Sequence, residues 1–421
     1  MINLEEVYIV DFLRSPFSRS RPQKPETDVF NKIDMPTVAA MLVKEIVNRT
    51  NVDPREIGDI VTGCTMQMKE NWLFGGRIIP ILAELPVEVP AQGTERVCIS
   101  GMSAMHQCAM EIMLGYSEIT IACGIEHMTH LPMQLEFNPC MAVSPTIMQR
   151  FDLIQKYDLM TAIVMGLTAE KLFEKYKDEI GWIKRDLDEW GVRSHMKATK
   201  ALKDGYFHNG AGYNIKFKGS VKGEILPIEV ELADGTRRVI DSDQSIRPDT
   251  SLEAVEKLPP AFKPGGVITA GNSSPLNAGA AAIMLMSKKK MREYDLEPMA
   301  KILSLGWAGV DPSVMGEGPV PASRKALKHA GLEVKDIDYW EINEAFAVVT
   351  LFAIKKLGIE PEKVNVKGGA IAIGHPLAVS GIRITGTLAR ILNIENAKYG
   401  LATLCGGGGQ GGAVVIENPN V

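Results

Sequence analysis

An internal duplication constrains the fold of this chain more than any other feature. The segment "VDPREIGDIVTG" follows an apolar-periodic stretch, "AAMLVKEIVNRT", and "EVKDIDYWEIN" follows "ASRKALKHAG" in the second half. Each pair reads as an amphipathic helix, a turn and a hydrophobic strand, and Ile57 corresponds to Ile337. Two similar halves are therefore expected.

Two further matches occur in the same order. Aligning Ser100 with Ser380, each followed by Gly, uses the same separation as Ile57 with Ile337. The Cys-Gly pair that begins at Cys123 matches the one at Cys405, with a difference of only two residues. Several matches that occur in the same order, with nearly the same number of residues between the matching positions, support a duplication better than any single match.

Strands alternate with helices of ten to fifteen residues in both halves, which indicates βαβ units and a largely parallel sheet covered by helices. The stretch from about 126 to 262 has no counterpart in the second half, and it includes helical runs at 165–176 and 187–202. We expect an α/β fold with an N-terminal half at 1–125 and 263–296, an inserted substrate-binding region at 126–262, and a C-terminal half at 297–421.

Bulk properties exclude several classes of protein. The 421 residues are 45% hydrophobic and 23% charged, which is ordinary for a soluble globular protein, and the net charge of −5 gives no general basic field for nucleic acid. The start reads as a strand at 7–10 and not as a targeting segment. No apolar run long enough to span a bilayer is expected.

Six cysteines are scattered along the chain without a disulfide framework or a paired zinc motif, so free thiols in a reducing cytoplasm are expected. Cys98 lies in "ERVCISGMSAMHQCAMEIML", at the head of a helix with an apolar face. The positive end of the helix dipole is expected to lower the pKa of its thiol and favour the reactive thiolate. A buried structural cysteine is the ordinary alternative.

Two glycine-rich segments carry further reactive groups. His375 lies in "GGAIAIGHPLAVSG", where glycines and Pro376 predict a sharp bend that presents one side chain at the rim of a sheet. Cys405 ends an apolar strand and precedes four glycines, whose bare N–H groups can hold an oxyanion. The alternatives are a loop histidine that caps a neighbour and a flexible glycine turn.

Asn343 and Glu344 end another apolar strand, where polar residues of α/β sheets tend to line a site. An ordinary helix cap is the alternative for Asn343. A nucleophile, a base, an oxyanion donor and a second thiol at loop positions of two related halves together suggest acyl transfer through a thioester.

The sequence closely resembles the thiolase family, especially the 3-ketoacyl-CoA and acetoacetyl-CoA thiolases. The resemblance covers nearly the whole chain in order and rests on "CISGMSA", "GIEHMTHLPM", "MGLTAE", "TAGNSSPLNAGAAA", "VMGEGPVPA", "INEAFA", "GGAIAIGHP" and "LCGGGGQG". Each motif is weak alone, but eight in sequence are very specific.

The resemblance implies catalytic roles residue by residue. Cys98 matches the nucleophile that becomes acylated, and His375 matches the base that activates it. Cys405 matches the acid/base at the α-carbon of acetyl-CoA. Asn343 matches the residue that holds a water in one oxyanion hole, which His375 completes. The N–H groups of Cys98 and Gly407 match the second oxyanion hole.

Three further positions match residues that line the substrate site. Ser274 matches a contact to the pantetheine arm of coenzyme A (CoA), and Met165 and Met315 match apolar residues at the acyl end of the pocket. The resemblance implies ping-pong cleavage of a 3-ketoacyl-CoA, or the reverse Claisen condensation, through an acyl-Cys98 intermediate. CoA is then a substrate, and neither a bound cofactor nor a metal is expected.

The family fold implies two βαβαβ-type halves in five alternating layers of helices and sheets, with an inserted loop domain. It also implies a homodimer or homotetramer that works in fatty-acid metabolism, such as β-oxidation, in the cytoplasm. The sequence leaves open the acyl chain, the physiological direction, the choice between dimer and tetramer, and the need for a partner subunit.

Four positions depart from the family pattern. Ala378 stands where Gly is usual after the histidine, Glu95 where Asn is common, Ala278 where Asp is common, and Val164 where many short-chain members have His. None removes a catalytic group. Val164 makes one wall apolar, which suits a longer, branched or aromatic acyl chain.

Three alternatives compete with this interpretation. A 3-ketoacyl synthase of the same superfamily usually pairs its Cys with two His, whereas this chain supplies one His and a second Cys. A non-catalytic lipid-binding relative is expected to lose reactive groups, and all four motifs keep theirs. A thiolase-like subunit that depends on a partner protein stays open.

Overall fold

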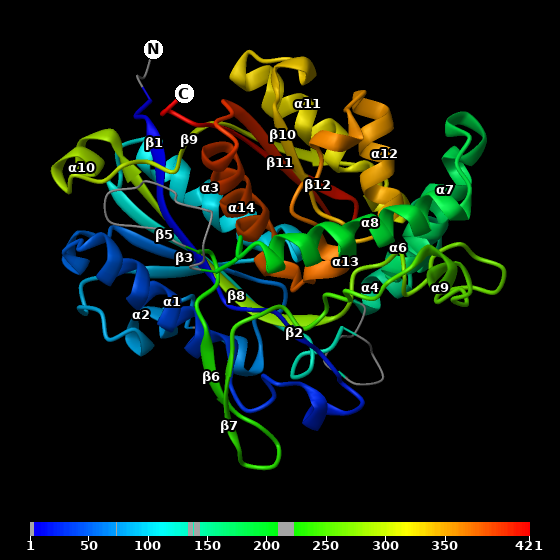
Figure 1. The fold of residues 1–421 in the computed structure, drawn as a ribbon, viewed down its shortest axis with the longest axis horizontal. Coiled ribbons are helices and arrows are strands. Elements are labelled where there is room, and N and C mark those ends of the chain that lie inside the picture. Colours follow the sequence, from blue (N-terminus) through cyan, green and yellow to red (C-terminus); the bar gives the residue numbers. More distant parts are fainter. Residues whose placement is uncertain (1–3, 73, 134–137, 139–143, 209–222) are drawn as a thin grey trace.

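The computed structural model of the protein describes residues 4–72, 74–133, 138, 144–208 and 223–421. Two sets of elements repeat in the same order, which confirms the duplication (Figure 1). The first set is β1 (Val7–Arg14), α1 (Met35–Thr50), β3 (Asp59–Cys64), α3 (Ser100–Met113), β5 (Ile119–His127) and β8 (Asn277–Ser287). The second is β9 (Ala300–Gly309), α11 (Pro319–Ala330), β10 (Tyr339–Ile342), α14 (Ser380–Ile394), β11 (Tyr399–Gly406) and β12 (Gln410–Glu417).

Shorter elements connect these sets. In the first half they are β2 (Ser18–Arg19), η1 (Pro25–Thr27), η2 (Pro54–Glu56), η3 (Lys69–Asn71), α2 (Ile78–Leu82), β4 (Ala91–Thr94), η4 (Val97–Ile99) and α10 (Lys288–Glu293). In the second they are η5 (Pro312–Glu317), η6 (Val334–Asp336), α12 (Ala347–Leu357), η7 (Pro361–Lys363), α13 (Ala370–Ile373) and η8 (Leu377–Val379).

The matched positions are structurally equivalent. Ile57 and Ile337 are both buried and each follows a one-turn helix, η2 or η6. Ser100 and Ser380 each begin a long helix directly after a one-turn helix, η4 or η8. The two halves therefore present their helix starts, and the turns before them, in the same way.

The strands form one continuous sheet in the order β10-β11-β12-β9-β1-β8-β5-β3-β4, with β2 paired to β8. Each half contributes one side of this sheet, and the halves meet where β1 pairs with β9 through Val7–Ile9. The expectation of a largely parallel sheet is wrong. Among the described strands of this sheet, only β3 with β4, β3 with β5, and β10 with β11 run parallel.

The glycine segment explains part of that difference. It does not lead into a helix but forms the tight hairpin between β11 and β12, where Gly406 pairs with Gln410. Gly408 and Gly409 have positive φ, 76° and 79°, which a short hairpin turn requires. Strands joined by such a turn must be antiparallel.

Helices divide the core into layers. α3 and α14 contact each other and pack between the two halves of the sheet, in one buried cluster that includes Met102, Met105 and Ile382. On the outer faces, α1 covers the first half of the sheet and α11 and α12 cover the second. The order is helix, sheet, helix pair, sheet, helix, which confirms the expected five-layer α/β class (Figure 1).

Helix α14 is buried on all sides. The window Leu377–Ile394, which includes it, is long and apolar enough to cross a membrane by length and composition, contrary to expectation. However, 89% of this window is buried inside the protein. Its place between the two halves of the sheet accounts for its apolar character.

The described part of the insert packs against both halves of this core. Its elements are α4 (Pro145–Met148), α5 (Phe151–Lys156), α6 (Leu159–Ala162), α7 (Met165–Ile180), α8 (Lys184–Lys203), β6 (Ile228–Glu231), β7 (Arg237–Ile240) and α9 (Leu252–Glu256). The helices expected at 165–176 and 187–202 are confirmed as α7 and α8. Strand β5 runs to His127, so the insert begins slightly later than expected.

Buried ion pairs connect the insert to both halves. Arg14 on β1 binds Asp243 with two hydrogen bonds of 2.7 and 2.9 Å and Glu224 with one of 2.8 Å. Arg390 on α14 binds the other oxygen of Glu224 at 3.1 Å. All four side chains are buried, so each charge depends on its partners.

Candidate active site

Cys98 lies in a strained turn at the start of α3. The residue before it, Val97, has a φ of 48°, which is uncommon for a β-branched side chain. Glu95 accepts a hydrogen bond from the Val97 N–H at 2.6 Å. Ser100 Oγ accepts from the Arg96 N–H at 2.8 Å and donates to the Val97 carbonyl at 2.6 Å. These bonds hold the turn that presents Cys98.

The thiol of Cys98 is 5% exposed and receives a hydrogen bond from the backbone N–H of Gly407. Burial raises its pKa to about 12, outweighing this bond, and the charges of Glu126 and Glu95 add to the rise. The expectation that the helix dipole would lower this pKa is wrong, because loss of water around the thiolate is the larger effect. At neutral pH the resting group is a thiol that needs a base.

Cys405 lies beside Cys98 at the end of β11. It is 1% exposed and pairs with Gly411 across the hairpin. Burial raises its pKa, and the charge of Cys98 raises it further, so the two thiols lie within electrostatic reach. A methyl group placed on Gly407 would lie 3.5 Å from Met165 Sδ. The structure therefore brings Cys98, Cys405, Gly407 and Met165 together.

His375 is held by its backbone and by its ring. Its N–H donates to Asn277 Oδ1 at 2.8 Å, and its Nδ1 lies 2.6 Å from Ser380 Oγ. Ser380 Oγ is also 3.3 Å from the carbonyl of Pro376, which can only accept. With Nδ1–H donating to Ser380 and Ser380 donating to Pro376, Nε2 is the ring nitrogen without a proton, and the Asn343 amide nitrogen lies 3.4 Å from it.

The imidazole of His375 is neutral. Burial lowers its pKa to about 3, and the nearby charge of Arg383 acts in the same direction. Ser380 carries no charge that would stabilise the imidazolium. A neutral ring with an unprotonated Nε2 is the form that a general base requires.

The loop that carries His375 rests directly on the helix that carries Cys98. A methyl group on Gly101 would lie 2.1 Å from the carbonyl oxygen of Ala378, and one on Gly124 would lie 2.6 Å from it. Helix η8 also contacts η4. Two glycines thus allow an approach that any larger residue would prevent.

Asn343 directly follows β10 and faces His375. Its Nδ2 lies 3.4 Å from Nε2 of His375, and its Oδ1 is buried with no partner among the described residues. Helix α12 begins only at Ala347, with Phe346 as its N-cap, so the explanation of Asn343 as a helix cap is wrong. An unpaired buried oxygen beside an imidazole suits a bound water.

Glu344 fixes the base of the same loop. It accepts hydrogen bonds from Trp190 Nε1 at 3.0 Å, Ser194 Oγ at 2.6 Å, Asn365 Nδ2 at 2.9 Å and the Ile371 N–H at 3.2 Å. It therefore joins the insert to the segment that leads to His375.

Ser274 and Met315 lie around this centre. Ser274 Oγ donates to the carbonyl of Ala345 at 3.0 Å and lines a cavity of about 110 Å³ with Arg19 and Arg247. Met315 belongs to the buried cluster that contains Cys405.

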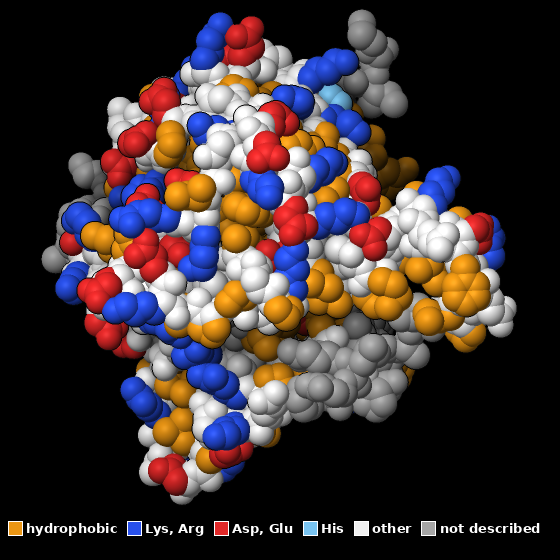
Figure 2. Space-filling model, turned by 90° about the vertical axis from the view of Figure 1, so that its right-hand side faces the viewer, with side chains coloured by type: hydrophobic (Ala, Val, Ile, Leu, Met, Phe, Trp, Pro, Cys, Tyr) orange, Lys and Arg blue, Asp and Glu red, His pale blue; other side chains and the backbone are white. Residues whose placement is uncertain are grey.

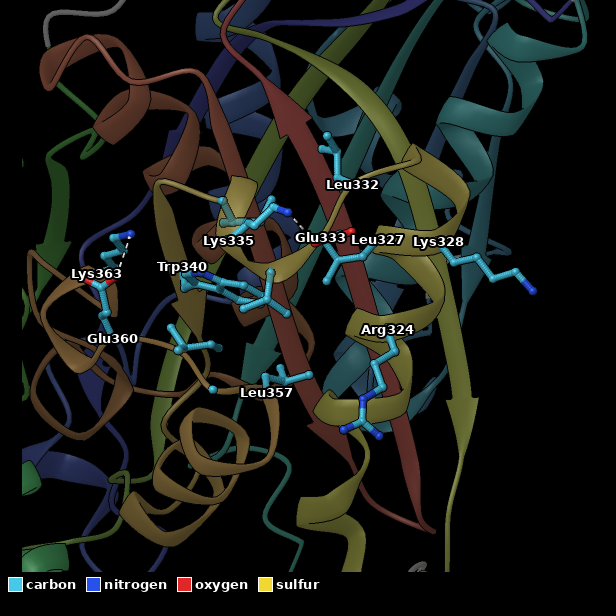
Figure 3. A pocket seen from close by; sticks show the side chains of 14 residues that line it. Arg324, Leu327, Lys328, Leu332, Glu333, Lys335, Trp340, Leu357, Glu360 and Lys363 are labelled. Atoms are coloured by element: carbon cyan, nitrogen blue, oxygen red, sulfur yellow. Dashed lines mark ion pairs between the residues drawn. The ribbon is translucent and has the colours of Figure 1, made fainter.

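The groove in Figure 3 is separate from these residues. It has a volume of about 660 Å³, lies between α11 and α12, and has Trp340 at its floor and Arg324 and Lys328 at its rim. It contains none of the expected site residues. In the described part of the chain, no cluster of His, Cys, Asp or Glu could hold a metal ion.

Three residues of the site were not expected from the sequence: Asn277, Ser380 and Glu126. Asn277 lies inside the quoted "SPLNAG", and Ser380 was used to align the halves, so both stood in segments already recognised. The partners of Asn277 and Glu126 come from distant segments, and the sequence gives no sign of these contacts. Ser380 instead contacts His375 and Pro376 within its own loop.

Comparisons with known proteins match this chain over nearly its whole length. Family models described as thiolase, N-terminal domain and thiolase, C-terminal domain match residues 7–289 and 296–418. The chain is 40% identical over 421 residues to a 3-ketoacyl-CoA thiolase of Marinobacter nauticus, covering 99% of each chain. It is 42% identical over 423 residues to one of Vibrio vulnificus, covering 99% of this chain and 100% of the relative.

Solved structures are similar over the same length. Human mitochondrial 3-ketoacyl-CoA thiolase superposes with a TM-score of 0.85 at 30% identity, covering 99% of this chain and 100% of the other. The structure of that enzyme in complex with CoA has a TM-score of 0.83 at 31% identity, covering 99% of each chain. The Bacillus anthracis acetyl-CoA acetyltransferase has a TM-score of 0.81 at 32% identity, again covering 99% of each.

Proposed function

Since this chain belongs to the thiolase family and is a CoA-dependent acyltransferase, we propose that Cys98 is the residue that carries the acyl group. One observation carries this assignment: the buried thiol meets the Gly407 N–H on one side and the second thiol, Cys405, on another. The loop of His375 packs on the turn that holds it. A nucleophile, an oxyanion donor, a second acid/base and a base thus converge.

In the cleavage direction, Cys98 Sγ attacks the 3-keto carbon while His375 Nε2 takes its proton. The bond between C2 and C3 breaks, the acyl group stays on Cys98, and an acetyl-CoA enolate leaves. Cys405 gives its proton to C2 of that enolate. The thiol of a second CoA then attacks the acyl carbon and gives its proton to the Cys405 thiolate, while His375 returns its proton to the departing Cys98 sulfur. Condensation is the same sequence reversed.

The charge that develops on oxygen needs fixed donors. The N–H groups of Cys98 and Gly407 are proposed to hold the oxygen of the acyl group. Asn343, through a water, and His375 are proposed to hold the thioester oxygen of the enolate. Removing one such donor costs about 3 kcal/mol, or roughly two to three orders of magnitude in rate.

Four cations support a binding path for the phosphates of CoA. Arg19, Arg21 and Lys24 line a cavity of about 760 Å³, and Arg19 also lines the cavity of Ser274 and Arg247. Burial lowers the pKa of Arg19, and the charges of Arg21 and Arg247 lower it further. No carboxylate of the described residues pairs with these four, so an anion would relieve their repulsion.

Arg19→Gln tests this path. It should raise KM for CoA several-fold, with little change for a pantetheine thioester that lacks the nucleotide phosphates. Lys32→Gln is the matched control, because Lys32 lies in the same N-terminal segment but already pairs with Glu231. Equal effects on both substrates would contradict the role of Arg19.

A medium or long acyl chain is proposed as the substrate. Val164, directly before Met165, is partly exposed, and the exposed side chains of Ile163 and Met160 continue the apolar surface along α6. Val164→His should lower kcat/KM for long acyl chains more than for acetoacetyl-CoA. A preference for acetoacetyl-CoA in the unmodified enzyme would contradict this assignment.

A homo-oligomer, a dimer or a dimer of dimers, is proposed from the free edge of the sheet. β4 pairs only with β3 among the described strands, and the exposed apolar residues Trp72, Ile81 and Val87 lie close to it in the sequence. Ile81→Asp should lower the mass measured by light scattering, whereas Val239→Asp on the β7 hairpin should not. An unchanged mass in the first variant would reject this interface.

We place the reaction in the cytoplasm, within fatty-acid metabolism such as β-oxidation. The five cysteines of the described residues are free and buried, which suits a reducing compartment. On the face shown in Figure 2, cationic and anionic side chains are intermixed, which supports small-molecule CoA substrates over nucleic acid. Co-purification from the native source tests for a partner subunit.

The two thiols can be separated experimentally. Cys405→Ala should still form the acyl-enzyme but lose exchange of the acetyl-CoA α-protons with deuterated water. Cys98→Ala should lose acylation. If Cys98→Ala kept full turnover, the proposed nucleophile would be wrong.

A further inference from the structure

Glu126, near the end of β5, is a buried carboxyl that the mechanism does not use. It is 1% exposed. One oxygen, Oε2, accepts hydrogen bonds from Thr65 Oγ1 and from the Ala378 N–H, the latter at 3.2 Å. The other oxygen, Oε1, is buried without a partner among the described residues. An unsatisfied buried carboxylate oxygen is costly unless the group is uncharged.

The contacts of Glu126 join three elements of the site. Thr65 follows β3, Glu126 belongs to β5, and Ala378 lies in η8, three residues after His375. The carbonyl of Ala378 rests on Gly101 and Gly124 while its N–H faces Glu126. The carboxyl therefore fixes the backbone of the loop that carries the base.

The charged and titratable groups around Glu126 are few. Its charge acts on the thiols of Cys64 and Cys98 and raises both pKa values, as does the charge of Glu95. No Lys, Arg or His of the described residues forms an ion pair with it. Burial raises the pKa of Glu126 to about 7, although the bonds from Thr65 and Ala378 act in the opposite direction.

We propose that Glu126 is a positioning residue of this reaction, which holds the His375 loop against β3 and β5 and favours an anion on Cys98 only while its own carboxyl is uncharged. A role of Glu126 in catalysis rests on the proposed function. As the pH rises through the range in which Glu126 ionises, its proton passes to solvent and a second negative charge forms near Cys98. Formation of the Cys98 thiolate then becomes harder.

The test is the pH dependence of Cys98 alkylation by iodoacetamide in the full-length, substrate-free protein, followed on the peptide that contains Cys98. Reactivity of a thiol rises with pH as thiolate forms. In the unmodified protein the plot of alkylation rate against pH should show a break near pH 7, above which the rise is shallower. In Glu126→Gln, which keeps an accepting oxygen but cannot ionise, this break should vanish. Alkylation at pH 8.5 should then be roughly three- to tenfold faster, a change of about half to one pKa unit.

A second pair of variants keeps the test decisive if Glu126→Gln does not fold. Thr65→Val removes a donor to the carboxylate, so the break should move to higher pH and kcat should fall. Thr62→Val is the matched control, because Thr62 lies on β3, three residues before Thr65, and its buried hydroxyl has no partner among the described residues. It should leave the break in place.

An identical alkylation profile in Glu126→Gln, or an unmoved break in Thr65→Val, would overturn the proposal. A purely structural role predicts a change in stability with no change in the profile. Alkylation measures the reactivity of the Cys98 thiol and does not require turnover. If the protein showed the predicted alkylation profile but no thiolase activity, the result would count against the proposed function. It would not count against the coupling of Glu126 to Cys98.

Discussion

Gly101→Ala tests the close contact between the two reactive loops. Helix propensity alone favours alanine over glycine by about 1 kcal/mol inside a helix. The added methyl, however, would lie 2.1 Å from the Ala378 carbonyl oxygen, whereas Cβ atoms in proteins essentially never approach a neighbour closer than 3.0 Å. The loop that carries His375 must therefore retreat from Cys98 by about 1 Å, and misplacement on that scale costs roughly a hundredfold in rate. Overpacking costs about 1–3 kcal/mol, which offsets or exceeds the propensity gain.

The assay compares kcat with the free energy of unfolding in denaturant. We expect kcat to fall about a hundredfold, with a net loss of stability of up to about 2 kcal/mol. Gly309→Ala is the control, since a methyl group there meets nothing within 4 Å and its φ is not in the left-handed region. If Gly101→Ala were as active as the control and more stable than the unmodified protein, the packing of the His375 loop on α3 would be refuted.

Three further changes probe separate parts of the site and the fold. Ser380→Ala should lower kcat by about ten- to a hundredfold and alter the pH profile of kcat, because the tautomer of His375 is no longer fixed. Ser380→Thr should recover part of the loss. An unchanged pH profile in Ser380→Ala would contradict the assigned hydrogen bond. Glu95→Gln should speed alkylation of Cys98 at neutral pH, because its charge raises the pKa of that thiol; slower or equal alkylation would count against this effect. Asp243→Asn should cost about 3 kcal/mol of stability in denaturant titrations, because it leaves a buried guanidinium short of one carboxylate; a loss below 1 kcal/mol would show that water or another group replaces it.

The duplication was predictable because each half repeats the same local patterns of apolar residues. Helical and strand periodicity, together with the paired positions of Ile57 and Ile337, depend only on which side of each element is buried. The same holds for the helices that follow Ser100 and Ser380. The apolar patterns of the matching helices and strands are similar because each half forms the same layers.

The direction of the strands was not predictable in the same way. The glycines after Cys405 fit both a βα loop and a hairpin, and only the pairing of Gly406 with Gln410 decides between them. The sequence of α14 is likewise long and apolar enough to fit either a membrane-spanning helix or a buried central helix. Contacts between distant segments select the second.

The candidate site shows the same division. The motifs predicted Cys98 and Cys405 as the reactive thiols, because such groups belong to short recognisable segments, and the structure brings the two side chains near each other. They gave the wrong direction for the pKa of Cys98, since burial by distant residues outweighs the local helix dipole. The supporting contacts of Asn277 and Glu126 join segments far apart in the chain, so no local pattern reveals them.

The central claim is that an acyl group is carried on Cys98, and mass spectrometry tests it most directly. The purified protein would be incubated with acetyl-CoA and with 3-ketoacyl-CoAs of increasing length, quenched in acid, digested and mapped. We predict an acyl mass on the peptide that contains Cys98, fullest with the longer chains, present in Cys405→Ala and absent from Cys98→Ala. An adduct located on Cys405 instead, or none from any substrate in correctly folded protein, would contradict the account.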